Sequence, residues 1–444
     1  NSRNASKSLF LLAWLSLEIG EEEEFVGELA SFLASSDLTS GLVRDAFRVC
    51  SDPMHAYGRF DLAERIELLC KRKLDSMERR PEGLYRETAH FSAIGHIALV
   101  ESLVKGVATG LVSQSVELVN GDHVIAHPMY AEMLAEKARE VGIKVMPSST
   151  ISDAWREPDL ETWPSAVGGY TIARHSYGLV EKEWQRQRSG PLLSLRHDFR
   201  EQVRAPLEKL GFCVDYWFAA IHLRSGQEAR RSLRNTPVER LRAASEQIVS
   251  EGGQVLVIGD FQGELLLELE DGIIDTRGRG ISTEELRKIH LFAWGLARFF
   301  VGNLSGGTFP PGTFGVPTLW IDTYPISHFR PYRRNDFFMP KLPFSVQLNR
   351  LLTLEEALSV QHSRSQVESG EILERHGYRL IANTEEDVRL GVLDMLRRVE
   401  KCEAIASTDL NEEVDRVMAS RGLGFGASIA PSFLRKWSDA LFNA

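Results

Sequence analysis

Hydrophobic residues gather in short runs over the middle of the chain, and each run ends in a small or polar residue. The runs cover 216–223, 255–259, 272–275, 298–302 and 318–322, and helical patterns separate several of them. Continuous apolar runs of this length are typical of strands that are buried on both faces of a parallel sheet. Strands that alternate with helices predict a doubly wound α/β domain, in which ligands bind at the carboxyl ends of the strands.

Helical periodicity dominates both ends of the chain. Residues 5–80 read as helices, and Ser51-Asp52-Pro53 within them predicts a turn or the cap of a following helix. Further helices are expected near Leu354, over 385–399 and along the tail to Ala444. The first 80 residues contain no pattern typical of catalysis.

A smaller α/β pattern precedes the long apolar runs. It consists of predicted helices over 97–107 and 128–141 and a strand over 143–146. In the later part, Thr236-Pro237 predicts a helix start with Thr as the N-cap and Pro at the first helical position. The polar group Ser282 to Glu285 predicts the start of another helix.

The length of 444 residues exceeds what one hydrophobic core supports, so we expect more than one domain. The patterns indicate an N-terminal helical segment over 1–83 and a smaller α/β domain over 84–212. A larger α/β domain would follow over 213–400, with further helices over 401–444.

The composition is that of an ordinary soluble protein, with 43% hydrophobic and 26% charged residues. The formal charge of −10 argues against nucleic-acid binding and against binding to an anionic membrane, which both need a basic face. The four cysteines lie far apart without zinc-site spacing, which predicts reduced thiols in a cytoplasmic protein.

Residue types that suit ligand binding follow the predicted strands. His222 and Arg224 end the first run, Gly259-Asp260 the second and Asp275 the third. The fourth run leads into Gly302-Asn303-Leu304-Ser305-Gly306-Gly307-Thr308. This loop offers several backbone N–H groups and two hydroxyls, which can bind a phosphate without a metal.

Gly95 and His96 lie directly before the helix expected over 97–107. A glycine at that place lets the backbone approach a ligand, and a helix N-terminus favours anions. His96 is either a base or phosphate contact, or a side chain that caps the first turn or packs on it. The sequence leaves both interpretations open.

Several common enzyme classes lack support in the sequence. It contains neither the GxGxxG dinucleotide motif after a first strand nor the GxxxxGK[ST] phosphate loop, and no GxSxG nucleophile motif. Metal-ligand clusters at coordinating spacing are missing too, so no metal site is predicted. The remaining Arg, His, Asn and glycine-rich N–H donors suit an anionic diphosphate with an attached base.

At these residues the chain resembles a known family. The matching pieces are Ile94-Gly95-His96, His222-Leu223-Arg224, Ser232-Leu233-Arg234-Asn235, Gly252-Gly253, Ile258-Gly259-Asp260, Ile274-Asp275, Ala297 to Gly302, Ser305-Gly306, Phe314-Gly315-Val316-Pro317 and Met339-Pro340-Lys341-Leu342. In this order and spacing they resemble the fucosyltransferase-like branch of the GT-B glycosyltransferases, which includes the protein O-fucosyltransferases and core fucosyltransferase, and a related bacterial glycosyltransferase family. The resemblance runs from Leu84 to Glu356 and is strongest over 220–342.

The resemblance implies a GT-B fold, with two Rossmann-like domains facing a central cleft and extra helices at both ends. The domain over 84–212 would be the acceptor-side one and the domain over 213–400 would bind the nucleotide sugar, and the helices over 401–444 would pack back across both. It implies an inverting, metal-independent transfer of a sugar from a nucleoside-diphosphate sugar, with a GDP-sugar favoured and no cofactor. We expect a small-molecule acceptor, with a hydroxyl or a thiol as in antibiotic biosynthesis. The partners are then the donor and the acceptor, and a homodimer is left open.

The resemblance also implies roles for individual residues. His222 would contact the nucleotide, Arg224 would hold the β-phosphate, and His96 beside Gly95 would be the base. The loop residues Ser305, Gly306, Gly307 and Thr308 would complete the diphosphate cradle. Structural roles stay open: a salt bridge for Arg224 and a packed strand end for His222.

Each remaining candidate has a functional and a structural interpretation. Arg234 and Asn235 would order the loop over the donor or only its fold, while Gly259-Asp260 and Asp275 would bind hydroxyls or base, or cap turns. His290 stands where relatives place an Asp that reads guanine, and Val257 where they place an Arg. An imidazole lacks the paired acceptor oxygens of a carboxylate.

Two other functions stay open. One alternative is a nucleotide-sugar epimerase, because GT-B folds host such enzymes too. The other, which the changes at Val257 and His290 favour, is a non-catalytic scaffold subunit that would bind nucleotide or a partner chain and release no diphosphate.

Overall fold

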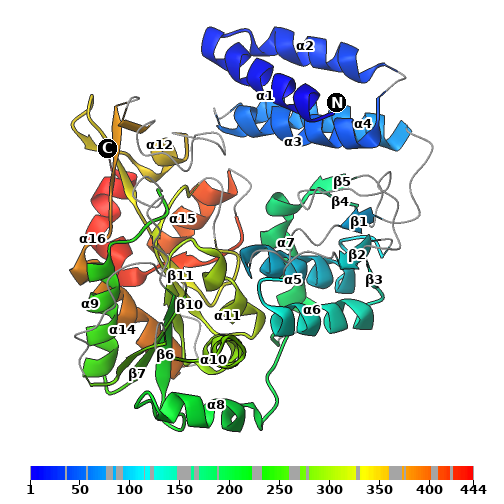
Figure 1. Cartoon of the computed structure of the whole chain (residues 1–444). Coiled ribbons are helices and arrows are strands. Elements are labelled where there is room, and N and C mark those ends of the chain that lie inside the picture. Colours follow the sequence, from blue (N-terminus) through cyan, green and yellow to red (C-terminus); the bar gives the residue numbers. More distant parts are fainter. Residues whose placement is uncertain are drawn as a thin grey trace.

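The computed structural model describes residues 2–35, 38–56, 59–76, 84–86, 94–114, 116–120, 125–147, 162–164, 170–187, 190–222, 233–259, 271–276, 280–326, 331–359, 373–374, 377–401, 409–420 and 424–443. Figure 1 shows three regions that follow the order of the chain: a group of helices, a small α/β unit and a larger α/β unit. None of the helices in these ranges combines the length and the apolar character that crossing a membrane requires.

The described part of the first 76 residues is helical, as predicted, with α1 (Ser2–Ile19), α2 (Glu22–Leu33), α3 (Ser40–Ala56) and α4 (Phe60–Ser76). These helices bury a core of their own, which includes Phe25, Phe47 and Ile66. The predicted turn at Ser51-Asp52-Pro53 is wrong, because Pro53 lies inside α3. Cys50 and Met54 on either side of it are fully buried, and this packing offsets the hydrogen bond that a proline cannot donate.

The smaller α/β unit is built on a three-stranded parallel sheet in the described residues, with the order β1-β2-β3. Its strands are β1 (Leu84–Arg86), β2 (Val116–Asn120) and β3 (Lys144–Pro147). The helices are α5 (Ile94–Ala108), α6 (Pro128–Glu140) and α7 (Ala173–Gln187), and β4 (Thr162–Pro164) pairs with β5 (Tyr170–Ile172). The predicted helices and the strand at 143–146 are thus confirmed, whereas β1 and β2 were not predicted.

The larger unit contains, within the described residues, a seven-stranded sheet with the order β15-β11-β10-β9-β6-β7-β8. Its strands are β6 (Phe218–His222), β7 (Gln254–Ile258), β8 (Ile273–Asp275), β9 (Phe300–Gly302), β10 (Thr318–Thr323), β11 (Phe337–Pro340) and β15 (Ser428–Ile429). All neighbouring strands in this sheet are parallel. All five predicted apolar runs are strands of this sheet, so the predicted α/β fold is confirmed.

The strand order reverses between β6 and β9. The chain proceeds from β6 through β7 to β8 on one side, and then crosses over to β9 on the other side of β6. Such a reversal leaves a crevice at the carboxyl ends of the two strands, because the connections on either side diverge from it. The fold therefore places the most favourable ligand position at His222 and Gly302.

Alternate residues of the sheet face two different cores, as a strand period of two requires. Phe218, Ala220 and Leu256 belong to one core, whereas Ala219, Ile221 and Val255 belong to the other. The first face is covered by α8 (Phe199–Glu208) and α10 (Thr283–Leu296). The second face is covered by α9 (Val238–Ser250), α14 (Glu385–Lys401) and α16 (Pro431–Phe442).

Of the two predicted helix starts in this unit, one is confirmed and the other is wrong. Ser282 caps α10, since its hydroxyl accepts from the Glu285 N–H and the Glu285 carboxylate accepts from the Ser282 N–H. The predicted Thr236 cap is wrong, because α9 begins at Val238 and Pro237 takes the N-cap position. The ψ of Pro237 is 143°, which is extended and not helical, so Pro237 lies before the helix and not at its first position.

The rest of the larger unit is a small antiparallel sheet and short helices. Its elements are α11 (Pro310–Thr313), β12 (Leu342–Ser345), β13 (Arg350–Leu351), α12 (Leu354–Ser359), β14 (Tyr378–Ile381) and α15 (Asp409–Ala419). The predicted helices near Leu354 and over 385–399 are confirmed. The strands β11 to β15 were not predicted.

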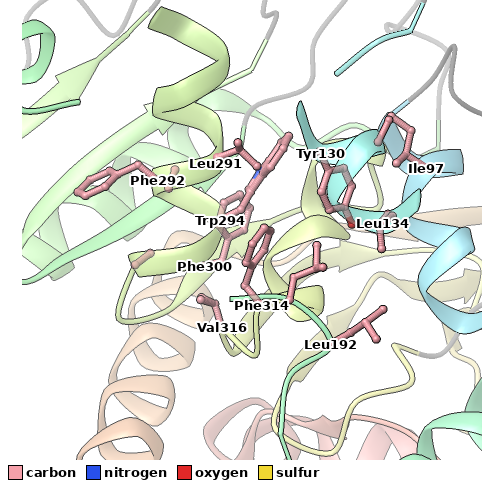
Figure 2. Close-up of a cluster of buried hydrophobic side chains, with 14 of the residues drawn as sticks. Ile97, Tyr130, Leu134, Leu192, Leu291, Phe292, Trp294, Phe300, Phe314 and Val316 are labelled. Atoms are coloured by element: carbon pink, nitrogen blue, oxygen red, sulfur yellow. The ribbon is translucent and has the colours of Figure 1, made fainter. Parts of the chain in front are cut away.

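The two α/β units share one continuous apolar core. Tyr130 of α6 packs with its ring centroid 5.5 Å from that of Trp294 in α10 and 6.1 Å from that of Phe314. Figure 2 shows these three rings between Ile97 and Leu134 on one side and Phe300 on the other. The smaller unit is therefore packed firmly against the larger one beside α10.

Candidate functional site at the ends of β6 and β9

His222 and Gly302 lie side by side at the reversal point of the sheet, paired in the parallel register of β6 and β9. The His222 side chain is only 6% exposed. It lies against Gly307, where a β-carbon would stand 2.2 Å from the imidazole Nε2. Gly307 is therefore needed for the ring to rest on the backbone of the loop that follows β9.

This loop forms a single tight turn, the 3-10 helix Gly306–Thr308. The Ser305 N–H donates to the Asn303 carbonyl at 2.7 Å, and the Thr308 N–H donates to the Ser305 carbonyl at 3.0 Å. For the amides of Gly306 and Gly307, no acceptor is found among the described residues. Two adjacent free N–H groups of this kind can bind an anion.

The N-terminus of α5 reaches this loop from the smaller unit. A β-carbon on Gly95 would stand 2.7 Å from the Gly306 Cα, and one on Gly306 would stand 2.8 Å from the Gly95 N. Both positions must be glycine for the two backbones to meet. The partial positive charge of the α5 N-terminus is thereby placed beside the free loop amides.

Gly95 and His96 lie in the first turn of α5 and not before it, because the helix begins at Ile94. This corrects the expected position of both residues by one turn. The His96 side chain is outside the described part of the structure, so its role as a base stays a prediction.

Thr308 and the segment with Arg234 and Asn235 adjoin the same loop. Thr308 is fully buried and packs on Gly302, where a β-carbon would lie 2.5 Å from the Thr308 Oγ1. The Asn303 amide donates to the Arg234 carbonyl at 3.1 Å, which attaches the 234–235 segment to the end of β9. The structure thus brings together predicted residues from three separate stretches of the chain.

The other strand-end candidates lie along the same edge of the sheet. Gly259 follows β7 with a φ of 123°, a backbone conformation that glycine adopts readily. Asp275 ends β8 and is buried, two strands away from β6. Arg224 and Asp260 fall outside the described residues, so their predicted roles are not tested.

His290 lies in a cluster of rings where the two units meet. Its ring centroid is 6.1 Å from that of His127 and 5.6 Å from that of Trp294. Burial lowers the pKa of His290 to about 3, and the nearby His127 and His222 add to this shift. His290 is therefore neutral near pH 7, and within the described chain its Nε2 has no hydrogen-bond partner.

His127 was not predicted, although it connects the two units directly. Its Nδ1 accepts from the Tyr130 N–H at 3.2 Å as the N-cap of α6, so in the neutral ring Nε2 carries the proton and donates to the Arg287 carbonyl at 3.1 Å. Burial lowers the pKa of His127 to about 4. In the sequence, only the next residue, Pro128, indicated that a helix starts here, because proline is typical of a first helical position.

A buried ionic network joins the same two units and was also not predicted. Glu101 of α5 forms an ion pair with Lys105 at 2.8 Å, and it accepts hydrogen bonds from the Thr313 hydroxyl at 2.8 Å and from Arg333. Lys105 also pairs with Glu181 of α7 at 2.7 Å. Burial opposes ionisation of Glu101, but Arg333 and Lys105 outweigh it, so the pKa of this carboxyl is lowered.

The ionic network also lies close to the candidate site. Glu101 lies on the helix whose first turn contacts Gly306, and Arg333 lies beneath Gly312, where a β-carbon would be 2.0 Å from the guanidinium carbon. Buried charges that are fully paired fix a packing arrangement, because any separation would leave them unpaired. The Glu101–Arg333 pair therefore holds α5 in place against the loop after β9.

The described residues contain no cluster of three or more His, Cys, Asp or Glu that could hold a metal ion. The arrangement instead offers loop amides, a helix N-terminus and a buried imidazole at one point. These groups suit a phosphate-containing anion.

No protein-family model matches the chain, and no curated protein matches it. Among solved structures, it is similar to a glycosyl transferase family 9 protein from Veillonella parvula, at 11% identity and a TM-score of 0.36, over 71% of this chain and 80% of that chain. It is also similar to the E. coli heptosyltransferase WaaC with ADP-2-deoxy-2-fluoro heptose, at 11% identity and a TM-score of 0.31, over 58% of this chain and 92% of that chain. The same enzyme with ADP matches at 10% identity and a TM-score of 0.29, over 66% of this chain and 97% of that chain.

These proteins are glycosyltransferases of another branch than the fucosyltransferase-like one. The fucosyltransferase-like assignment therefore stays a prediction from the sequence motifs.

Proposed function

We propose that the chain is a glycosyltransferase that binds the diphosphate of a nucleotide sugar where β6, the loop after β9 and the N-terminus of α5 meet. The observation that supports this most is the contact of Gly95 with Gly306 at the reversal point of the sheet. Two glycines with facing backbones and two loop amides without an acceptor among the described residues suit a ligand that is rich in negative oxygens. The motif resemblance to GT-B glycosyltransferases supports the same conclusion independently.

In the proposed reaction, an acceptor oxygen or sulfur attacks the anomeric carbon from the side opposite the diphosphate. The new bond to the acceptor forms as the bond to the diphosphate oxygen breaks, which inverts the anomeric configuration. The acceptor proton passes to a base, for which His96 is the candidate. A thiol acceptor would depend less on that base, because thiolate forms near neutral pH.

The departing nucleoside diphosphate gains negative charge, and stabilising that charge is the main task of the site. The Gly306 and Gly307 amides and the α5 N-terminus supply fixed partial positive charge. Arg224, two residues after His222, would add a guanidinium that forks onto phosphate oxygens. This set needs no metal, so activity in EDTA is expected.

The donor nucleotide is proposed to be GDP on the strength of the resemblance. A neutral His290 presents one donor and one acceptor and cannot pair with guanine as a carboxylate does. His222 and the backbone would therefore carry more of the base recognition than in relatives with an Asp at this place.

The test is the release of nucleoside diphosphate from GDP-, UDP-, dTDP- and ADP-linked sugars, in EDTA, with simple alcohols or thiols as acceptors. Replacing Arg224 by Ala should lower turnover by about 10² or more, by analogy with the loss of an oxyanion donor. Arg196→Ala is the matched control, because Arg196 is exposed and pairs only with Asp198 among the described residues. Release of no diphosphate under any condition would support the scaffold alternative, and conversion of the sugar without an acceptor would support the epimerase.

A further inference from the structure

Three consecutive backbone carbonyls, those of Leu233, Arg234 and Asn235, are held by two buried side chains. The Lys341 Nζ donates to the Leu233 carbonyl at 2.8 Å and to the Asn235 carbonyl at 2.6 Å. The Asn303 amide donates to the Arg234 carbonyl between them at 3.1 Å. Three hydrogen bonds from these two side chains thus hold the segment in place.

The backbone at Lys341 is held by hydrogen bonds of its own. It lies between β11 and β12, and its backbone N–H donates to the Thr323 carbonyl at 3.0 Å. The preceding Pro340 carbonyl accepts from the Asn383 amide at 3.0 Å. Asn383 in turn exchanges two hydrogen bonds with Asp322, at 2.7 and 2.8 Å. The backbone that carries the Lys341 side chain is thus held at the ends of β10 and β11.

Lys341 is an unusual choice for a purely structural contact. It is only 7% exposed, and burying an ammonium is costly unless it is paired. The nearby Asp322 carboxyl, which is fully buried, offsets part of this cost through its charge. Two hydrogen bonds from a charged donor are stronger than the neutral bonds that an amide or a hydroxyl would make here.

The segment that Lys341 and Asn303 hold adjoins the candidate donor site. Asn303 directly follows Gly302 at the end of β9, and Ser305 and Gly306 come next. The same asparagine that contacts the Arg234 carbonyl also accepts, through its own carbonyl, from the Ser305 N–H at 2.7 Å. The position of the 233–235 segment is therefore coupled to the loop that offers the free amides.

We infer that Lys341 and Asn303 are positioning residues, which hold Arg234 and Asn235 at the donor diphosphate through the carbonyls of their own segment. This inference rests on the proposed function, because it assumes that a nucleoside diphosphate binds beside the loop after β9. Neither residue needs to contact the ligand. Removing either should weaken binding by displacing the segment, with the fold otherwise retained.

The experiment compares Lys341→Met, Asn303→Ala and Lys341→Arg with the wild type and with Lys288→Met. Lys288 is a suitable control because it pairs with Glu284 on the outer side of α10. Calorimetry measures the Kd of GDP, UDP, dTDP and ADP, and hydrogen exchange measures the amides of 233–236. Thermal unfolding shows whether each variant is folded at the assay temperature.

The inference predicts that Lys341→Met raises the Kd of the bound nucleotide by about tenfold or more, since two hydrogen bonds from a charged group are lost. Exchange over 233–236 should become faster, Lys341→Arg should restore part of the affinity, and Lys288→Met should match the wild type. A role in stability alone would lower the unfolding temperature and leave the Kd unchanged, and that result overturns the inference. If Lys341→Met does not fold, Asn303→Ala decides by the same criteria.

The outcomes separate this inference from the function on which it rests. If the wild type binds a nucleotide and the folded variants bind it equally well, the inference fails and the proposed function stands. If the wild type binds none of the four nucleotides, the proposed function fails and the inference fails with it.

Discussion

The backbone of Gly95 in α5 lies directly against that of Gly306 in the loop after β9, with no room for a β-carbon on either residue. This contact joins the small α/β unit to the large one where the sheet order reverses. Its geometry explains why a glycine stands at the start of α5, where a larger residue would otherwise favour the helix. The candidate site therefore depends on how firmly α5 is held.

Replacing Gly95 by Ala should push the Gly306 backbone away, because the new β-carbon would meet it at 2.7 Å. Overpacking of this kind costs about 1–3 kcal/mol of unfolding free energy, and we expect weaker binding of nucleoside diphosphates as well. Urea unfolding and calorimetry measure the two effects. Gly27→Ala is the control, because Gly27 lies inside α2 with no atom within 4 Å of its β-carbon position. Equal losses in both variants would refute the importance of the contact.

Replacing Glu101 by Gln should destabilise the protein strongly. The change leaves the buried Arg333 guanidinium without its carboxylate, which typically costs about 3–5 kcal/mol. The midpoint of urea unfolding measures the loss. Arg204→Ala, which breaks an exposed network with Glu201 and Asp215, should change the midpoint little. A Glu101→Gln protein as stable as the wild type would show that the network does not hold the units together.

Replacing Tyr130 by Phe should remove one link of a buried chain of hydrogen bonds. The Thr313 hydroxyl donates to Glu101, so it accepts from the Tyr130 hydroxyl at 2.8 Å. Loss of such a bond costs about 1 kcal/mol, while the ring packing against Trp294 and Phe314 is kept. Tyr216→Phe is the control, since Tyr216 is about half exposed. A loss that is the same in both variants would contradict this view of the interface.

The fully buried His127 and the partly buried His290 predict how stability depends on pH. The unfolded protein binds a proton at each histidine below about pH 6.5, whereas burial lowers the folded pKa of His290 to about 3 and that of His127 to about 4. Stability should therefore fall as the pH is lowered from 6.5 towards 4. Burial raises the pKa of Asp336 to about 6, which opposes this trend in the same range.

A variant isolates the contribution of His290 from that of Asp336. Between pH 7 and 4.5, His290→Gln should lose about 2 kcal/mol less unfolding free energy than the wild type, because Asp336 acts equally in both. Urea unfolding at a series of pH values provides the comparison. Parallel curves for the two proteins would show that the His290 pKa is not lowered by the fold.

The sheet could be predicted from the sequence because its main strands are local patterns. The runs that form β6, β7 and β10 are continuous and apolar, and Ser282 with Glu285 is a local capping pattern. The strands β11 and β15 escaped prediction because Phe337–Pro340 ends in proline and Ser428–Ile429 is too short for any periodicity. Pro53 stays within α3 because of tertiary packing, and tertiary packing leaves no local pattern in the sequence.

The loop residues of the candidate site were predicted from composition, but the contacts that hold them were not. Ser305, Gly306 and Gly307 form a recognisable glycine-rich stretch after a strand. Glu101 and Arg333 are 232 positions apart, and nothing in either local sequence indicates the other. The same holds for Lys341 and the carbonyls near residue 234. Such pairs exist only because the fold brings distant strand ends together.

We propose that a nucleoside diphosphate binds where the N-terminus of α5 meets the loop after β9. Hydrogen exchange of the wild type, with and without saturating GDP, UDP, dTDP or ADP in EDTA, is the test of this binding site. At least one nucleotide should protect amides both at 94–100 and at 303–309. Protection confined to another part of the chain, or no protection by any of the four nucleotides, would refute the proposed site.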